Sequence, residues 1–278
     1  MGTLVFGNGW LGKMFARRYN CPVLSVDIVD AKEVACAIEK YRPELVINAA
    51  GKCGFPNIDW CAATSDNRRL TWHTNALGPA IVETACILAG VPQFVHLSSG
   101  CMWRSGINIT EDTPFDPPSF YIKSKAEGEA RLHTDYSLIV RFRMPFNSDL
   151  NAPRNLIAKL LKYDHLIDEQ NSMVFSDDLI NTIVFLAEQK KRGVYHITNP
   201  GTLSACDVMQ QYCAEVDSSH SFKRITYHEL LGSKRVACER SNITLSTEKL
   251  TAAGMVLPSV RDRMYQCLTH IAEVGRVL

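Results

Sequence analysis

Residues 3–12 read TLVFGNGWLG, and this stretch decides the fold of the chain. Residues 3–6 form a short apolar run typical of a buried strand, and residues 13–19 have the pattern of a helix. Between them, the first glycine of G-x-G-x-x-G permits a tight turn, the second lets the backbone approach a pyrophosphate, and the third lets helix and strand pack closely. The helix start offers free N–H groups and a partial positive charge to phosphates. The order of strand, glycines and helix therefore predicts a dinucleotide-binding site rather than a merely glycine-rich turn.

The alternation of strands and helices continues as far as residue 143. We expect helices at 31–41, 65–88 and 118–132, and further strands at 22–26, 44–50, 93–98 and 136–143. Such alternation indicates an α/β fold, a doubly wound parallel sheet of the Rossmann type. Beyond residue 145 the pattern is mixed. We therefore expect a dinucleotide-binding domain over 1–145 and a smaller C-terminal substrate lobe over 146–278, with segments free to interleave and the substrate cleft between them.

Composition excludes several classes of protein. The chain has 278 residues, of which 46% are hydrophobic and 21% charged, as in an ordinary soluble globular protein. A formal net charge of +1 gives no preference for nucleic acid or membrane surfaces. No apolar run approaches about 20 residues, so no membrane span is expected. Ten cysteines without a C-x-x-C pair favour a reducing cytoplasm, and no spacing suggests a metal site.

Polar side chains follow the strands at the ends where open α/β sheets bind ligands. Ser99 comes directly after the strand at 93–98, and Tyr121 and Lys125 lie four residues apart at a helix start. A cation near a phenol of pKa about 10 favours its ionisation, which makes the phenol a usable proton donor near neutrality. By itself this spacing also fits a half-buried aromatic residue and a solvated lysine. The agreement with the glycine turn and Ser99 favours a catalytic group.

This order of motifs resembles the extended short-chain dehydrogenase/reductase superfamily. The resemblance implies that Ser99 orients a carbonyl, that Tyr121 exchanges a proton with it, and that Lys125 holds the nicotinamide ribose and tunes Tyr121. Negative charge that develops on the carbonyl oxygen would be met by two placed O–H groups. The implied cofactor is NADPH or NADH, and the expected cofactor-binding residues are Gly7, Asn8, Gly9, Trp10, Leu11, Gly12, Asp27, Ile28, Asn48, Ala49, Ala50, Tyr121 and Lys125.

Asp27 has two open interpretations. It ends the second strand, where a carboxylate can contact the ribose or adenine of a dinucleotide. It also precedes the helix that begins at Ala31, where a carboxylate can serve as the helix cap.

Longer strings support a closer resemblance. They include Asn48-Ala49-Ala50-Gly51, Pro56-Asn57-Ile58-Asp59-Trp60-Cys61, Arg143-Met144-Pro145, Pro153-Arg154-Asn155, Asn171-Ser172-Met173 and Arg240-Ser241-Asn242. These strings resemble the UDP-4-keto-6-deoxyglucose 3,5-epimerase/4-reductase family, whose members make UDP-L-rhamnose and are related to dTDP-4-dehydrorhamnose reductase. The resemblance extends over nearly the whole chain.

The resemblance implies roles for further residues. Cys101 and Lys159 are the implied acid/base pair that epimerises C3 and C5 of the sugar, and a thiol near a cation can titrate near neutrality. Their alternatives are a small buried hydrophobe and a solvated lysine. Arg240 is the implied diphosphate contact, or else part of a surface salt bridge. The implied substrate-binding residues are Asn57, Ser99, Met144, Asn155 and Arg240.

The chain also departs from the family. Its first turn, Gly7-Asn8-Gly9-Trp10, is shorter than the usual Gly-Arg-Thr-Gly-Trp, so a basic residue for a 2′-phosphate is missing. Phe55 and Ala62 stand where arginine and glutamate are usual. These changes leave open NADPH or NADH, and also the sugar, with a 2-acetamido sugar as one alternative.

The expected function is that of a cytoplasmic NAD(P)H-dependent 4-reductase, with 3,5-epimerase activity, of a nucleotide-linked 4-keto-6-deoxyhexose. A UDP-linked substrate is favoured over a dTDP-linked one, and no nucleic acid or membrane is expected as a partner. Two alternatives stay open: a reductase without epimerase activity, acting for example on dTDP-4-dehydrorhamnose, and a regulatory subunit without catalysis. The resemblance also allows a homodimer formed through the helices at 65–88 and 118–132.

Overall fold

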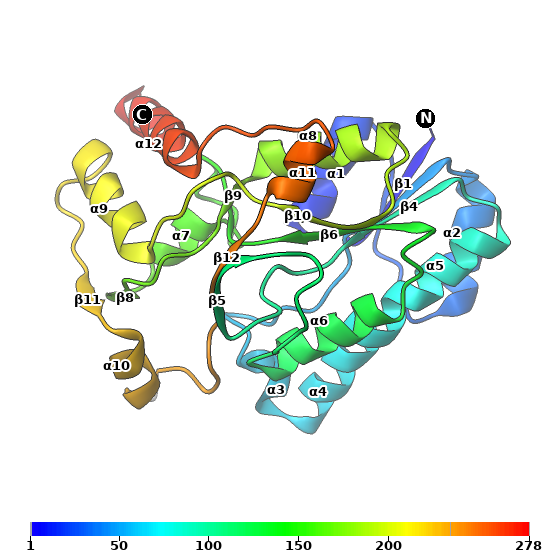
Figure 1. The fold of residues 1–278 in the computed structure, drawn as a ribbon, viewed down its shortest axis with the longest axis horizontal. Coiled ribbons are helices and arrows are strands. Elements are labelled where there is room, and N and C mark those ends of the chain that lie inside the picture. The colour runs from blue at the N-terminus through cyan, green and yellow to red at the C-terminus, as the bar shows by residue number, and fades with distance from the viewer. Residues whose placement is uncertain (1, 234, 278) are drawn as a thin grey trace. The chain divides into compact units, whose positions relative to one another are not determined.

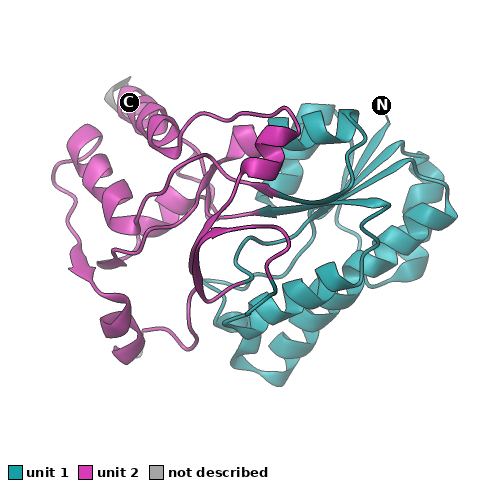
Figure 2. Ribbon diagram, in the orientation of Figure 1, with its two compact units in different colours: residues 1–102, 114–141, 180–195 teal, residues 103–113, 142–179, 196–278 magenta. Residues whose placement is uncertain are grey.

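The computed structural model describes residues 2–233 and 235–277 (Figure 1). Residues 1 and 278, the outer ends of the two expected domains, lie outside the described residues. The chain forms two compact units (Figure 2). Unit 1 comprises residues 1–102, 114–141 and 180–195, and unit 2 comprises residues 103–113, 142–179 and 196–278. Each unit is therefore assembled from three separate segments of the chain.

The central sheet has six strands among the described residues, in the order β2-β1-β3-β4-β6-β10. They are β1 (Thr3–Phe6), β2 (Val23–Leu24), β3 (Leu45–Asn48), β4 (Gln93–Leu97), β6 (Ser137–Phe142) and β10 (Gly193–Ile197). β1 pairs in parallel with β2 and β3, β3 with β4, and β4 with β6. The predicted doubly wound parallel sheet is confirmed. Because β2 and β3 lie on opposite sides of β1, the strand order reverses at β1, where such sheets bind ligands.

Helices cover both faces of this sheet (Figure 1). α1 (Trp10–Tyr19) and α8 (Ser176–Glu188) lie on one face, and α2 (Ala31–Tyr41), α5 (Gly78–Leu88) and α6 (Phe120–Ala130) lie on the other. A buried apolar cluster fills the space between the sheet and the second group of helices. Its members include Leu4, Phe6, Val46, Phe94 and Ile139 of the strands and Val34, Ile38, Val82 and Cys86 of the helices.

The cap of α2 settles one of the two interpretations of Asp27. Asp30 is the N-cap, because its carboxylate accepts the backbone N–H groups of Lys32 and Glu33, both at 3.0 Å. Asp27 instead accepts the N–H of Val29 at 3.3 Å within the preceding turn. The alternative in which Asp27 caps this helix is therefore wrong: Asp27 lies three positions before Asp30, the residue that occupies the cap.

The helix expected at 65–88 is divided into three parts. α4 (Ser65–Trp72) is followed by a π-helical segment, η1 (His73–Leu77), and then by α5. The N–H of Gly78 bonds to the carbonyl of His73, five residues back. Pro79, in the first turn of α5, has no N–H to donate to a preceding carbonyl, and the π-helical segment ends two residues before it. The short helix α3 (Trp60–Ala63), which precedes α4, was not expected from the sequence.

Helix α6 lies in backbone contact with η1. A Cβ atom at Gly128 would lie 2.0 Å from the carbonyl oxygen of Asn75 and 3.1 Å from its carbonyl carbon. Real Cβ atoms do not approach backbone so closely, so position 128 admits only glycine without movement of the two helices.

Replacing Gly128 by alanine should therefore destabilise the protein. We expect the Gly128→Ala variant to lose about 1–3 kcal/mol of unfolding free energy, as overpacked sites do. Gly232 is the matched control, because it ends helix α10 and no atom lies within 4 Å of a Cβ built there. Gly232→Ala should be neutral or stabilising by up to about 1 kcal/mol. Urea unfolding measures both, and equal stabilities of the two variants would contradict the close contact.

Unit 2 has a separate core formed by three helices. Apolar residues of α7 (Leu156–Leu160), α9 (Ala205–Glu215) and α12 (Val260–Val277) meet there, among them Ile157, Met209, Met264 and Leu268. The described residues of unit 2 also form three parallel strand pairs: β5 (Ser105–Ile109) with β12 (Asn242–Leu245), β7 (Pro145–Phe146) with β9 (Val174–Phe175), and β8 (His165–Ile167) with β11 (Lys223–Ile225). The remaining helices are α10 (Tyr227–Gly232) and α11 (Glu248–Ala252). Among the described residues no helix is both long and apolar enough to cross a membrane.

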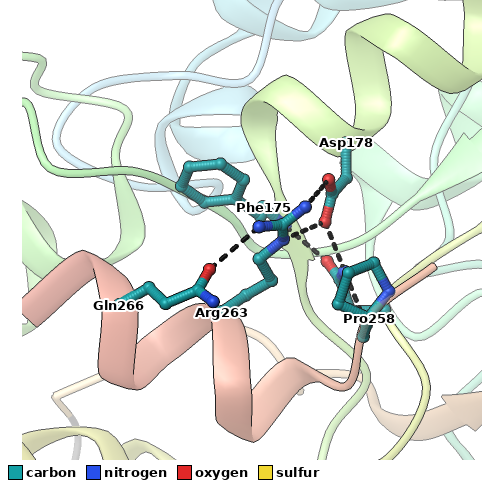
Figure 3. Close-up of polar contacts among 6 residues, drawn as sticks. Phe175, Asp178, Pro258, Arg263 and Gln266 are labelled. Carbon is teal, nitrogen blue, oxygen red and sulfur yellow. Dashed lines mark hydrogen bonds and ion pairs between the residues drawn. The ribbon is translucent and has the colours of Figure 1, made fainter.

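An ion pair fixes the beginning of α12 within unit 2 (Figure 3). Arg263 donates from Nε and Nη2 to the two carboxylate oxygens of Asp178, each at 2.8 Å. Asn199 donates to the same carboxylate at 2.6 Å and to the carbonyl of Pro258 at 3.0 Å. The guanidinium also lies over the ring of Phe175. Because the buried Asp178 has donors for both oxygens, this pair meets the condition under which a buried charge is tolerated.

Candidate active site

The glycine turn lies where the strand order of the sheet reverses. Gly7 has a φ of +102°, and a Cβ atom there would lie 2.4 Å from the backbone nitrogen of Ala50, which follows β3. A Cβ atom at Gly12 would lie 1.9 Å from the carbonyl oxygen of Gly7. These two glycines let β1, α1 and the loop after β3 approach one another closely, as the G-x-G-x-x-G motif predicts.

The same turn fits the pyrophosphate of a dinucleotide. Gly9 is the N-cap of α1 and has no side chain to occupy the helix start, and the first turn of α1 has no acidic residue. No heavy atom lies within 4 Å of a Cβ built at Gly9, so the space in front of the helix is open. Open N–H groups at a helix N-terminus are suited to bind phosphate. Trp10 and Leu11 form the first turn, and exposed Asn8 donates to Ser25 Oγ at 3.1 Å.

The structure brings the segment Asn48–Ala50 to this turn. Asn48 is fully buried; its Oδ1 accepts the N–H of Ala50 at 3.1 Å and its Nδ2 lies 3.3 Å from Nδ1 of His96. The side chain of Ala49 lies against the position of a Cβ at Gly12. Asp27 is exposed after β2.

Ile28 differs from the other candidate cofactor residues. Its side chain is only 1% exposed and lies in the core of unit 1, against Gly78 of α5. That side chain contributes to packing, and only its backbone is left to face a ligand.

The end of β4 arranges the residues around Ser99. Ser99 is buried, and its Oγ accepts the N–H of Cys101 at 3.1 Å. A hydroxyl has one hydrogen and can accept two bonds, so this contact leaves the hydroxyl hydrogen of Ser99 able to donate to a carbonyl oxygen. Leu97, two residues earlier, accepts a hydrogen bond from Lys125 Nζ at 2.9 Å. Ser99, Cys101 and Lys125 are thus brought together in unit 1.

Helix α6 carries Tyr121 and Lys125 on one face. Its N-cap, Ser119, accepts the N–H of Ile122 at 3.3 Å. Within the first turn, Ser124 Oγ donates to the carbonyl of Tyr121 at 2.7 Å and accepts from Asn75 Nδ2 at 3.0 Å. These contacts fix the N-terminal part of α6 against η1. Tyr121 is half-buried.

Lys125 is buried, so it is not the solvated lysine of the alternative interpretation. Only 4% of its surface is exposed. Burial lowers its pKa to about 8, and the Glu129 carboxylate and the Cys53 thiol act in the opposite direction. Burial, and then the Lys125 charge, also hold the pKa of His96 well below its usual value, so this imidazole is neutral at pH 7.

The sequence analysis did not find a buried network next to Lys125. Ser98 Oγ donates to Glu129 Oε2 at 2.6 Å, and Arg141 Nε donates to Glu129 Oε1 at 2.8 Å. All three residues are at most 5% exposed. Two signals were present: Glu129 follows Lys125 by four residues, and Arg141 interrupts the apolar strand β6.

The loop after β3 is held by the side chain of Asn75. Its amide donates to the carbonyl of Lys52 and accepts the N–H of the same residue, both at 2.8 Å. The loop begins beside Lys125, because a Cβ at Gly51 would lie 3.9 Å from Lys125 Nζ. Farther along, Asn57 Oδ1 accepts the N–H of Asp59 at 2.9 Å, so this candidate substrate residue also shapes its own turn.

The other predicted substrate residues belong to unit 2. Met144, between β6 and β7, has a φ of +42°, an uncommon conformation for a residue other than glycine. Asn155 is fully buried; it caps α7 and donates to the carbonyls of Asn147 and Asp149, both at 2.8 Å, so its side chain stabilises this loop.

The last two candidate residues, Lys159 and Arg240, also belong to unit 2. Lys159 lies in the last turn of α7. The guanidinium of Arg240 donates to the carbonyl and Sγ of Cys238, at 2.8 and 3.0 Å.

Comparison with known proteins shows the family of the chain. The model of the RmlD substrate binding domain family matches residues 8–273. The chain belongs to this family. A bifunctional dTDP-4-dehydrorhamnose 3,5-epimerase/dTDP-4-dehydrorhamnose reductase of Arabidopsis thaliana is 31% identical, over 94% of this chain and 90% of its own. The trifunctional RHM1 protein of the same plant, a UDP-glucose 4,6-dehydratase/UDP-4-keto-6-deoxy-D-glucose 3,5-epimerase/UDP-4-keto-L-rhamnose-reductase, is 28% identical, and the chain spans 40% of its length.

A solved structure has the same fold. The L780 UDP-rhamnose synthase of Acanthamoeba polyphaga mimivirus superposes with a TM-score of 0.87 at 23% identity, covering 96% of this chain and 98% of that one. The expected kinship with dTDP-4-dehydrorhamnose reductases and with the extended short-chain dehydrogenase/reductase fold is confirmed. The chain is an oxidoreductase, and its cofactor is a nicotinamide dinucleotide.

The open space at Gly9 leads to a prediction about cofactor binding. Gly9→Ala should fold as stably as the unmodified protein, because nothing in the fold occupies the position of the new methyl group. The methyl group would meet the pyrophosphate, so the dissociation constant for NADPH and NADH should rise at least about tenfold, a cost of about 1.4 kcal/mol. Fluorescence titration measures binding, and Gly12→Ala, which crowds Gly7, should instead lose stability. Unchanged binding by Gly9→Ala would contradict this placement of the phosphates.

Proposed function

We propose that the chain is an NAD(P)H-dependent 4-reductase of a UDP-linked 4-keto-6-deoxyhexose that also epimerises C3 and C5 of the sugar. The observation that carries the proposal is the buried Lys125. Its ammonium bonds to Leu97, two residues before Ser99, and it lies one turn beyond Tyr121 on α6. A buried cation beside a phenol and a serine hydroxyl suits the reduction of a ketone.

Each of the three side chains has a distinct part in the proposed reduction. The Ser99 hydroxyl donates a hydrogen bond to the oxygen at C4 and holds the ketone in place. Tyr121 gives its phenolic proton to that oxygen as negative charge develops there. The Lys125 charge stabilises the phenolate that remains on Tyr121. When bound, the nicotinamide supplies the hydride.

The epimerase part of the proposal rests on Cys101. Its backbone N–H is bonded to Ser99 Oγ, so the residue that bears the thiol adjoins the hydroxyl that would hold the ketone. Removal of a proton from C3 or C5 creates an enolate on the same oxygen, and the Ser99 and Tyr121 hydroxyls would stabilise it. Lys159 is the proposed second acid/base. The name of the Arabidopsis relative, which combines epimerase and reductase, supports the pairing of the two activities.

The nucleotide of the substrate, the substrate contacts, the cellular location and the oligomeric state are further parts of the same proposal. The UDP-linked substrate is supported by the name of RHM1, whose sequence matches this chain over 94% of the chain. Met144, Asn155, Asn57 and Arg240 are the proposed contacts to the sugar nucleotide. We place the enzyme in the cytoplasm, as a homodimer formed through α4, α5 and α6.

The reduction is tested with the Tyr121→Phe variant. The unmodified protein should convert UDP-4-keto-6-deoxyglucose with NADPH or NADH, followed by NMR. Loss of the proton donor should lower turnover by about 10²–10⁴-fold, while cofactor binding persists. Normal turnover by Tyr121→Phe would exclude the role of Tyr121. No turnover by the unmodified protein on any 4-keto sugar nucleotide, together with a stable complex with another enzyme, would favour a regulatory subunit.

The epimerisation is tested separately in deuterated water. The unmodified protein should incorporate deuterium at C3 and C5 of the product, and Cys101→Ala should lose this incorporation but still reduce an already epimerised ketone. Cys36→Ala, which removes an exposed thiol on α2, is the matched control and should change neither activity. Cofactor consumption without deuterium in the unmodified protein would identify a reductase without epimerase activity.

A further inference from the structure

Three charged side chains are buried together in unit 1. Tyr121, Lys125 and Glu129 follow one another at four-residue spacing on α6 and therefore share one face of the helix. Arg141 of β6 meets the far end of this row at Glu129. Lys125, Glu129 and Arg141 are 4%, 5% and 4% exposed. The Glu129 carboxylate thus lies near two cations, Lys125 and Arg141, and all three side chains are almost completely shielded from solvent.

The carboxylate of Glu129 is held in place from two sides. Ser98 donates to Oε2 at 2.6 Å, and Arg141 donates from Nε and Nη2 to Oε1, the former at 2.8 Å. The guanidinium of Arg141 lies 4.8 Å from the ring centre of Phe115, which limits its own movement. Hydrogen bonds to both oxygens, including those from a guanidinium, restrict the movement of this carboxylate. Glu129 therefore presents a fixed negative charge one turn from Lys125.

A nearby negative charge matters because Lys125 is close to losing its proton. Burial lowers its pKa to about 8, and Glu129 is the first of the two groups that oppose this shift. The second is Cys53, in the loop after β3. From β4, the neutral imidazole of His96 and the carbonyl of Leu97 face Lys125 and add no negative charge. An ammonium this near to neutrality depends on its carboxylate neighbour.

We propose that Glu129 is a positioning residue of the reductase: its carboxylate, held by Ser98 and Arg141, keeps Lys125 protonated at neutral pH and so sets the alkaline limit of the activity. This inference rests on the proposed function, in which Lys125 must be charged to stabilise the Tyr121 phenolate. The activity is then constant below the pKa of Lys125 and falls as the pH rises through it. We therefore expect the alkaline limb of the pH profile, where the activity of the unmodified enzyme declines, near pH 8.

The test compares kcat/KM against pH for two variants that break the same ion pair. Glu129→Gln removes the negative charge, so the alkaline limb should move toward acid by about one pH unit. Arg141→Gln leaves the charge of Glu129 without its guanidinium partner, so the limb should move toward higher pH. A purely structural pair predicts no opposite shifts, because both variants would lose the same contact. Limbs that stay in place, or that move together, overturn the proposal.

A matched control lies on the same helix. Glu127, two residues before Glu129, is part-exposed and pairs with Arg131 at 2.6 Å. Glu127→Gln removes the same charge from α6, and its alkaline limb should coincide with that of the unmodified enzyme. A limb shifted as far as that of Glu129→Gln would mean that any charge on α6 acts on Lys125, and would overturn a specific role for Glu129.

Two further measurements keep the test decisive. If Glu129→Gln fails to fold because Arg141 is left unpaired, the double variant Glu129→Gln/Arg141→Gln removes both charges, and its limb should still lie on the acid side of the unmodified enzyme. An unshifted limb in the folded double variant overturns the proposal. If the unmodified protein reduces no 4-keto sugar, the proposed function fails, and the pH dependence of NADPH binding replaces kcat/KM. As the pH rises, binding by Glu129→Gln should begin to weaken at a lower pH than binding by the unmodified protein; this result supports the role of Glu129, and superimposable binding curves overturn it.

Discussion

Burial of the Lys125 ammonium is the constraint on which the candidate site depends. A buried charge is tolerated only where bonded groups and an opposite charge replace the water that it has lost. The carbonyl of Leu97 and the carboxylate of Glu129 supply these. The carbonyl is available only if the end of β4 lies against α6, where Ser98 also bonds the Glu129 carboxylate. The absence of a side chain at Gly128 lets α6 settle onto η1. The packing of unit 1 and the chemistry of its site therefore have a common origin.

The fold of unit 1 could be predicted because its signals are local. A strand, three glycines and a helix define the first turn, and the periodicity of apolar residues defines most of the later strands and helices. The predictions failed where the neighbouring sequence does not determine the structure of a residue. Asp27 and Asp30 both precede α2, and only the path of the backbone decides that Asp30 reaches the helix start. The strands of unit 2 are two to five residues long, too short for an alternation to be recognised.

The same distinction between local and distant contacts applies to the candidate site. Tyr121 and Lys125 have a recognisable spacing, but the burial of Lys125 depends on contacts with β4 that no spacing encodes. Glu129 and Arg141 are 12 positions apart and meet only in the folded chain. In unit 2 a similar ion pair, between the buried Asp178 and the part-buried Arg263, anchors a helix. An ion pair alone therefore does not show whether it serves a candidate site or only the fold; the residues around the pair decide this.

The π-helical segment η1 has a consequence for the helical stretch from α4 to α5. One extra residue in a turn rotates everything beyond it by about 100° around the helix axis. η1 packs on α6, whereas α5, beyond it, packs on α2. A straight α-helix would carry both contact surfaces along one unbroken stripe. The added residue instead acts as a phase shift: one part of the helical stretch supports the candidate site through Asn75, and the next part completes the hydrophobic core.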